Sequence, residues 1–106
     1  MTYIYAVKVE RVIDGDTVQL LVDLGFHLTA SMRFRILGVD TPERGQPGWA
    51  EATAFTRAWL EQSPGLTAAT EKADSFGRWL ADLHRPDGTC LSHALLAAGH
   101  AEVYTR

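Results

Sequence analysis

Three short motifs bring together the residue types that hydrolysis of a phosphate ester requires. They are residues 14–17 (Asp-Gly-Asp-Thr), residues 35–43, which begin with arginine and end in Asp-Thr-Pro-Glu, and residues 74–78 (Asp-Ser-Phe-Gly-Arg). Carboxylates bind hard cations and orient water, and the planar guanidinium of arginine binds phosphate oxygens. Each motif alone also fits an ordinary turn or strand end, because Asp and Gly favour turns. Their chemistry therefore depends on whether the fold brings them together.

The first third of the chain predicts a three-stranded meander that positions these motifs. Alternating apolar residues over 3–13, 17–22 and 28–38 indicate strands, and the Asp-Gly pair between the first two predicts a hairpin, since Gly tolerates positive φ. Asp16 opens the second strand and Asp40 closes the third, which is expected to pair with it antiparallel. The two carboxylates should meet at one end of the sheet. With a backbone carbonyl and waters they would form an oxygen site suited to Ca²⁺ or Mg²⁺.

The same end of the sheet is expected to gather a group that acts on water and one that holds phosphate. Glu43 follows Asp40 by three residues and would reach past the cation toward a water. Arg35, on the strand that ends in Asp40, would supply a planar fork for phosphate oxygens. Zinc is less expected, because the four histidines show no ligand spacing and Cys90 is the only cysteine.

The rest of the chain predicts two helices and two more strands. Helical periodicity predicts a first helix over residues 49–62. A second helix is expected after a cap at Thr89, with Leu91, Leu95 and Leu96 facing the core. Short strands are expected over 66–72 and 78–85. Five strands in the order three, helix, two, helix favour a closed antiparallel barrel of the OB type with helices packed against it. The expected fold class is mainly β with α (α+β), in one domain over residues 1–106.

The composition is that of a globular protein, with 46% hydrophobic and 22% charged residues and a net charge of -3. This acidic balance weighs against binding of nucleic acid by bulk positive charge, although it leaves room for a local basic site. A single cysteine forms no internal disulfide. Because the chain shows neither a signal peptide nor an apolar run near the roughly 20 residues of a membrane span, a cytoplasmic location and no membrane partner are expected.

Residues 12–17 (VIDGDT), 35–43 (RILGVDTPE) and 76–78 (FGR) resemble the staphylococcal nuclease (thermonuclease) family in order and spacing, from about residue 5 to residue 104. The resemblance implies an SNase-like OB-fold barrel. It also implies a calcium-dependent endonuclease, a hydrolase of phosphodiester bonds in DNA and RNA, preferably single-stranded. Such enzymes act by metal-assisted attack of water and leave 3′-phosphate ends.

The resemblance also implies a calcium site. By motif position, Asp16 and Asp40 would bind Ca²⁺ through their carboxylates, and Thr41 would contribute its backbone carbonyl. Asp14 falls at the position that supports the waters of the cation. Residues of the first two motifs would therefore form the calcium site.

The remaining roles that the resemblance implies concern water and phosphate. Glu43 is similar in position to the general base, or to the group that positions the attacking water. Arg35 and Arg78 would clamp the phosphate, with Arg78 closer to the leaving oxygen. Arg33 lies on the same face as Arg35 and is the alternative for its role, although the spacing to Asp40 favours Arg35.

This chain departs from the family beside the second arginine. Where the best-known member has a lysine and a tyrosine, this chain has Ser75 and Phe76. Phe76 keeps an aromatic face for a base or ribose, so weaker nucleotide binding is expected with the chemistry retained. Tyr104 falls where the family places a tyrosine on the base side of the substrate, and it equally fits core packing.

The chain also stops before the C-terminal helix of the family. An uncovered barrel face would expose apolar surface, which suggests a homodimer through that face. The alternative function is a non-catalytic OB-fold module that binds single-stranded nucleic acid or a protein partner, as degenerate relatives of the family do. The nuclease is favoured, because such a module does not need the residues expected to act on cation, water and phosphate.

Overall fold

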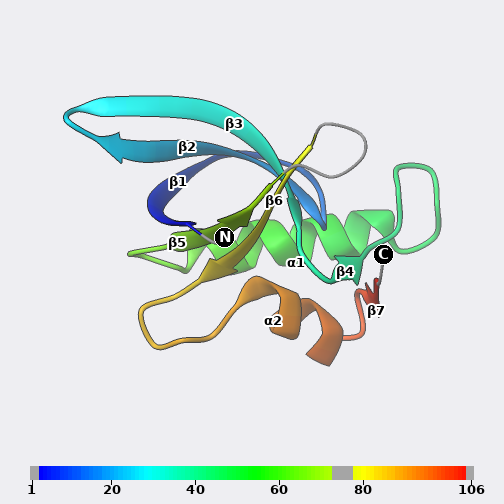
Figure 1. The fold of residues 1–106 in the computed structure, drawn as a ribbon. Coiled ribbons are helices and arrows are strands. Elements are labelled where there is room, and N and C mark those ends of the chain that lie inside the picture. Colours follow the sequence, from blue (N-terminus) through cyan, green and yellow to red (C-terminus); the bar gives the residue numbers. More distant parts are fainter. Residues whose placement is uncertain (1–2, 73–77, 105–106) are drawn as a thin grey trace.

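Five strands close into a barrel, in the order β1-β2-β3-β6-β5 around the ring (Figure 1). The structure is a computed structural model that describes residues 3–72 and 78–104. Its elements in chain order are β1 (Tyr3–Asp14), β2 (Thr17–Gly25), β3 (Leu28–Ile36), β4 (Val39–Asp40), α1 (Trp49–Glu61), β5 (Thr67–Glu71), β6 (Trp79–His84), α2 (Leu91–Ala97) and β7 (Glu102–Val103). The predicted five-stranded OB-type barrel with helices, mainly β with α, is confirmed.

The first three strands form the meander that the alternation predicts. β1 pairs antiparallel with β2, with Val9 opposite Leu20, and β2 pairs antiparallel with β3, with Leu20 opposite Met32. The β2–β3 hairpin projects beyond the rest of the barrel (Figure 1). Its turn residues Phe26 and His27 have φ values of 56° and 61°, so two residues with β-carbons occupy the left-handed region.

The prediction of a barrel that is antiparallel throughout is wrong at one pair. β3 and β6 run parallel, with Phe34 opposite Trp79 and Ile36 opposite Ala81. The odd number of strands in the ring explains this parallel pair. Neighbouring strands alternate in direction from β3 through β2, β1 and β5 to β6, and a ring of five cannot alternate all the way round. One parallel pair must therefore close it.

The third strand is also shorter than the alternation predicts. β3 ends at Ile36, and Gly38, with a φ of 78°, turns the chain before β4. β4 leaves the barrel and pairs antiparallel with β7, with Asp40 opposite Glu102. The predicted extended C-terminus is thus confirmed at β7, and it lies beside the Asp40 motif.

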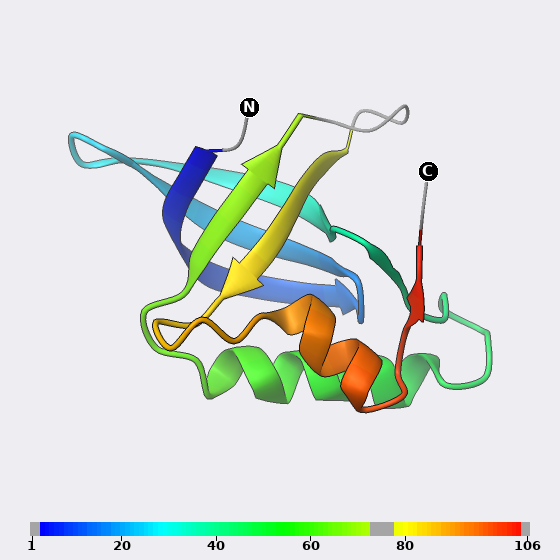
Figure 2. The ribbon, with the colours of Figure 1, turned by 60° about the horizontal axis from the view of Figure 1, so that its bottom comes forward.

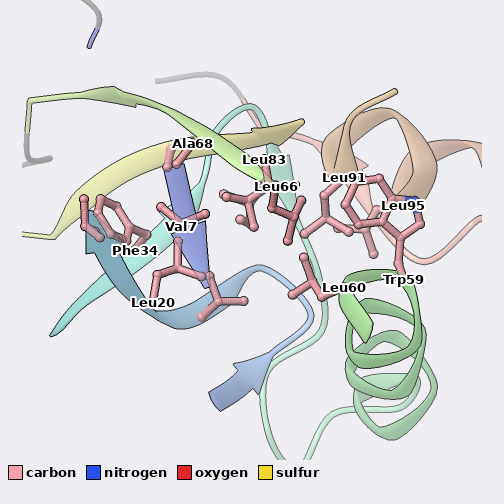
Figure 3. Close-up of a cluster of buried hydrophobic side chains, with 14 of the residues drawn as sticks. Val7, Leu20, Phe34, Trp59, Leu60, Leu66, Ala68, Leu83, Leu91 and Leu95 are labelled. Carbon is pink, nitrogen blue, oxygen red and sulfur yellow. The ribbon is translucent and has the colours of Figure 1, made fainter. Parts of the chain in front are cut away.

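Both helices pack on the same side of the barrel, beneath its strands (Figure 2). α1 contributes Trp59 and Leu60 to the core, and α2 contributes Leu91 and Leu95, as their helical spacing predicts (Figure 3). These side chains meet the inward residues of the strands, among which Leu20 is fully buried. The core therefore fixes the C-terminal half of α1 against the barrel. In the described ranges, no helix has the length and apolarity required to cross a membrane.

Candidate active site

Asp16, Arg35 and Asp40 lie together where β2 begins and β3 ends. The register of β2 and β3 sets Thr17 opposite Arg35. The Ile36 N–H donates to the Asp16 carbonyl oxygen at 2.8 Å, which fixes the start of β2 beside the end of β3. Nη2 of Arg35 lies 3.1 Å from Oδ1 of Asp40 and 3.5 Å from Oδ2 of Asp16. One guanidinium therefore bridges two carboxylates from different elements.

The two carboxylates have different environments. Asp16 is buried, whereas the side chain of Asp40 is 55% exposed. The Asp16 carboxylate accepts hydrogen bonds from the Thr41 N–H at 3.1 Å and from the Thr17 hydroxyl at 3.0 Å. Burial raises the pKa of Asp16 above its ordinary value, and the hydrogen bonds and the guanidinium of Arg35 offset only part of this effect. Asp16 is thus firmly held, with an incompletely compensated charge.

The oxygen atoms around Asp16 suit a hard cation. Asp16 and Asp40 are both carboxylates, and the Arg35 guanidinium that contacts them both carries a single positive charge. The buried hydroxyl of Thr41 has no hydrogen-bond partner within the part of the chain that the structure describes. Carboxylate and neutral oxygens are the ligands that Ca²⁺ and Mg²⁺ prefer. The residues present therefore fit a divalent cation, which would compensate the charge of the buried carboxylate.

Removal of the Asp16 charge should stabilise the cation-free protein at neutral pH. A carboxyl whose pKa is raised by folding contributes most below its ordinary pKa, and this contribution is lost as the pH rises through the raised value. We therefore expect Asp16→Asn to raise the Tm near pH 7 in chelator, and to lose this advantage toward pH 3. Thermal denaturation followed by circular dichroism across this range measures the difference. Asp23→Asn, at an exposed position of β2, is the control, and equal Tm values for Asp16→Asn and the parent at pH 7 would contradict the prediction.

Gly15 lets the turn between β1 and β2 sit directly on α1. A β-carbon at Gly15 would lie 3.0 Å from the β-carbon of Ala52 and 3.0 Å from both Cγ2 and Oγ1 of Thr41. The Thr56 hydroxyl donates to the Gly15 carbonyl oxygen at 2.7 Å. The hairpin pattern predicts a positive φ at this glycine. In the structure, Gly15 does not have a positive φ. Close packing is the reason that this position requires glycine.

Substitution of Gly15 should disturb both stability and the site. Gly15→Ala forces α1 or Thr41 to shift, and overpacking of this kind costs about 1–3 kcal/mol. The expected loss in Tm is roughly 4–8 °C for each kcal/mol. Calorimetry measures it, and Gly15→Ala combined with Ala52→Gly should lose less stability than the sum of the two single substitutions, because the second removes one of the clashing β-carbons. An unchanged Tm in Gly15→Ala would show that the contact is relieved at no cost.

Asp14 is held by the first residue of α1. The indole Nε1–H of Trp49 donates to Oδ1 of Asp14 at 2.6 Å, and the guanidinium of Arg44 lies 4.9 Å from the centre of the Trp49 ring. Sequence reasoning did not find this contact, since 35 residues separate the partners. The signal available in the sequence was an aromatic N–H donor at the start of the helix that follows the acidic motif.

Tyr104 contacts the guanidinium of Arg35. The guanidinium carbon of Arg35 lies 4.4 Å from the centre of the Tyr104 ring, and the Tyr104 N–H donates to the Gly38 carbonyl oxygen at 3.0 Å. The ring remains 42% exposed. By contrast, Arg33 is exposed and lies opposite Gln19 on β2. Of the two arginines that the sequence left in competition, Arg35 is the one that joins the carboxylates.

Three further residues that the sequence assigns to the site are Glu43, Arg78 and Phe76. Glu43 is exposed in the turn after β4, and its N–H donates to the side-chain oxygen of Gln46 at 2.8 Å. The contacts that join the two aspartates to Arg35 do not include the Glu43 side chain. Arg78 is half-buried directly before β6, the strand that pairs with β3. Phe76 lies outside the described residues.

A hollow opens beside Asp40 and gives the site an approach from solvent. Its lining includes Asp40, Thr41, Gln46, His100 and Glu102, from β4, the loop before α1 and the segment between α2 and β7. Asp40 thus faces a depression in the surface, whereas Asp16 and Arg35, which contact it or its arginine partner, are buried.

Comparisons with known proteins agree with this geometry. A sequence model of the staphylococcal nuclease homologue family matches residues 33–106. Two proteins named "Uncharacterized endonuclease", from Escherichia coli O157:H7 and from Escherichia coli, are each 29% identical over 97 residues. These alignments cover 92% of this chain and 60% of each relative. The chain therefore spans less than two thirds of the length of these curated relatives.

Proposed function

The chain belongs to the family of staphylococcal nuclease homologues, and on that premise we propose that it is a calcium-dependent nuclease that hydrolyses phosphodiester bonds in DNA or RNA. The observation that carries the proposal is the bridge from the Arg35 guanidinium to the carboxylates of Asp16 and Asp40. The buried and the exposed carboxylate supply oxygen ligands for a cation, and the arginine between them supplies hydrogen-bond donors for a phosphate. The relatives named as endonucleases support the same reading.

Asp16, Asp40 and Thr41 would hold the cation. Asp16 is preoriented by its hydrogen bonds, and Asp40 faces the hollow through which an ion and a substrate can enter. When bound, Ca²⁺ polarises the phosphoryl oxygen and draws the phosphate into the site. Asp14, fixed by Trp49, would support the waters around the ion.

The arginines and Glu43 would act on the phosphate and the water. Arg35 would bind a phosphate oxygen through its planar guanidinium, whose carbon lies 4.4 Å from the centre of the Tyr104 ring. Arg78 would stabilise charge on the leaving oxygen. Glu43, exposed beside the hollow, would orient the attacking water or accept its proton. Proton transfer to an exposed carboxylate leaves the proton free to exchange with solvent.

Cation removal tests the proposed function. Single-stranded DNA and RNA should be cleaved in Ca²⁺, and chelator should abolish cleavage, because two carboxylates beside one arginine cannot replace the charge of the ion. Products should be extended by a polymerase only after phosphatase treatment, as 3′-phosphate ends require. The same protein carrying Arg35→Ala, purified in parallel, excludes a contaminating nuclease.

Three outcomes of this assay oppose parts of the proposal. Full cleavage in chelator would overturn the cation, and 3′-hydroxyl ends would overturn the product. Tight binding of single-stranded nucleic acid without cleavage would favour the non-catalytic module instead. A preference for single strands over duplex is measured in the same assay, and sedimentation at micromolar concentration tests the predicted homodimer.

A further inference from the structure

Asp82, His84 and Cys90 form a second cluster of metal-binding side chains, outside the barrel core. One ligand atom from each residue lies within 4.8 Å of the other two. Asp82 and His84 stand two residues apart on β6. Because the intervening Leu83 and the preceding Ala81 are buried in the barrel, both side chains point outward from the sheet.

A tight turn brings Cys90 back to this face of β6. Cys90 forms a β-bridge with His84, and the Arg85 N–H donates to the Thr89 carbonyl oxygen at 2.8 Å. The hydroxyl of Ser92 donates to Oδ2 of Asp82 at 3.1 Å and lies 3.4 Å from Sγ of Cys90. The backbone therefore fixes the three donors relative to one another.

We propose that Asp82, His84 and Cys90 bind a zinc ion. A thiolate, an imidazole and a carboxylate are the three ligand types that Zn²⁺ takes in proteins. The carboxylate and the thiolate carry two negative charges, so the bound ion is neutralised. Binding replaces the thiol proton, which passes to solvent.

Two of the three side chains are partly exposed to solvent, which supplies a fourth ligand. The side chains of His84 and Asp82 are 36% and 22% exposed, so water reaches the open position. Opposite them on β5 stand only Thr67 and Ala69, whose side chains are small. Nε2 of His84 lies 3.8 Å from Oδ2 of Asp82. Tetrahedral zinc places such donors about 3.3 Å apart, so side-chain rotation brings them into range.

Arg85, the residue that follows His84, is engaged away from the cluster. The Arg85 guanidinium carbon lies 4.0 Å from the centre of the Trp59 ring. Its Nη2 donates to the Trp59 carbonyl oxygen at 3.1 Å, and its Nε donates to the Ser63 hydroxyl at 2.6 Å. Asp82 instead accepts hydrogen bonds from the Leu83 N–H at 3.0 Å and from the Ser92 hydroxyl, which hold its carboxylate beside His84.

The proposed zinc site is separate from the candidate active site. Arg35 lies opposite Leu80, near the start of β6, whereas His84 ends that strand. A zinc ion here would tie the end of β6 to the start of α2. Ligand spacing along the chain does not reveal this site, because only the turn at 85–89 brings Cys90 to the two strand residues.

Metal binding by the intact, metal-free protein tests the proposal directly. In a non-chelating reductant, calorimetry should detect one equivalent of Zn²⁺, and Co²⁺ should give the near-ultraviolet charge-transfer band of a thiolate ligand. At zinc concentrations a hundredfold above Kd the Tm should rise by roughly 10 °C or more. Cys90→Ser should lose the thiolate band, and His84→Gln should weaken zinc binding by about 100-fold or more.

His93→Gln, at an exposed position of α2, is the matched control and should leave zinc binding unchanged. Should Cys90→Ser fail to fold, His84→Gln carries the test, since its half-exposed position tolerates glutamine. The proposal is overturned if the folded parent takes up no zinc, or if zinc binding is equal in the parent and in His84→Gln. Neither result bears on calcium-dependent cleavage, which is measured separately.

Discussion

Arg35→Ala should lower kcat/KM on single-stranded DNA by roughly 10²–10³-fold or more, while Arg33→Ala stays near the parent. The two arginines lie on the same strand two residues apart, so the pair is matched for charge and for location. Of these two arginines, Arg35 is the one whose guanidinium contacts Asp16 and Asp40. Steady-state kinetics at saturating Ca²⁺ measures the difference.

A loss of activity in Arg35→Ala also has a structural explanation, which Arg35→Lys separates. Truncation removes the guanidinium that offsets part of the cost of burying the Asp16 charge, and this costs stability as well as catalysis. Lysine retains the charge but not the planar fork, so Arg35→Lys should keep most of the Tm and still lose much of kcat. A kcat of Arg35→Lys equal to that of the parent would remove bidentate phosphate binding from the mechanism. Strong loss in Arg33→Ala would move the phosphate site along β3.

Glu43→Gln should lower kcat by roughly 10²–10⁴-fold without a change in Tm. Glu43 is exposed in a turn, so the fold does not depend on its charge. Glutamine keeps the size and hydrogen-bonding shape of the side chain but cannot accept a proton at neutral pH. Calorimetry and single-turnover cleavage at saturating substrate provide the two measurements. Glu51→Gln, at an exposed position in the first turn of α1, is the matched control.

The pH profile distinguishes the two roles of Glu43. A proton acceptor gives an acidic limb in the profile of kcat that Glu43→Gln abolishes, whereas a group that only orients water gives a parallel profile at a lower level. Activity in Glu43→Gln within twofold of the parent would remove this residue from the chemistry. The water would then have to be positioned by other side chains around the hollow.

The barrel could be predicted from the sequence because its strands carry local signals. Alternation and the turn at residues 14–17 predict the meander, and the meander alone brings Asp16 toward the end of the third strand. The parallel pairing of β3 with β6 was missed, although it follows from closing five strands into a ring.

What the sequence could not predict depends on contacts between distant residues. The indole of Trp49 reaches Asp14 across 35 positions, and the Thr56 hydroxyl reaches the Gly15 carbonyl across 41. Helical periodicity predicts that α1 packs on the barrel, but not which turn of the helix meets which loop. The role of Gly15 was misassigned for the same reason, since its need for space arises from Thr41 and Ala52.

The pairing of β7 with β4 has a consequence for the order in which a newly made chain becomes competent. β7 and Tyr104 are the last described parts of the chain to leave the ribosome, and they supply the strand beside Asp40 and the ring against Arg35. A nascent chain with a complete barrel still lacks both supports. The geometry around Arg35 is therefore completed only after β7 and Tyr104 have been synthesised, later than the barrel itself.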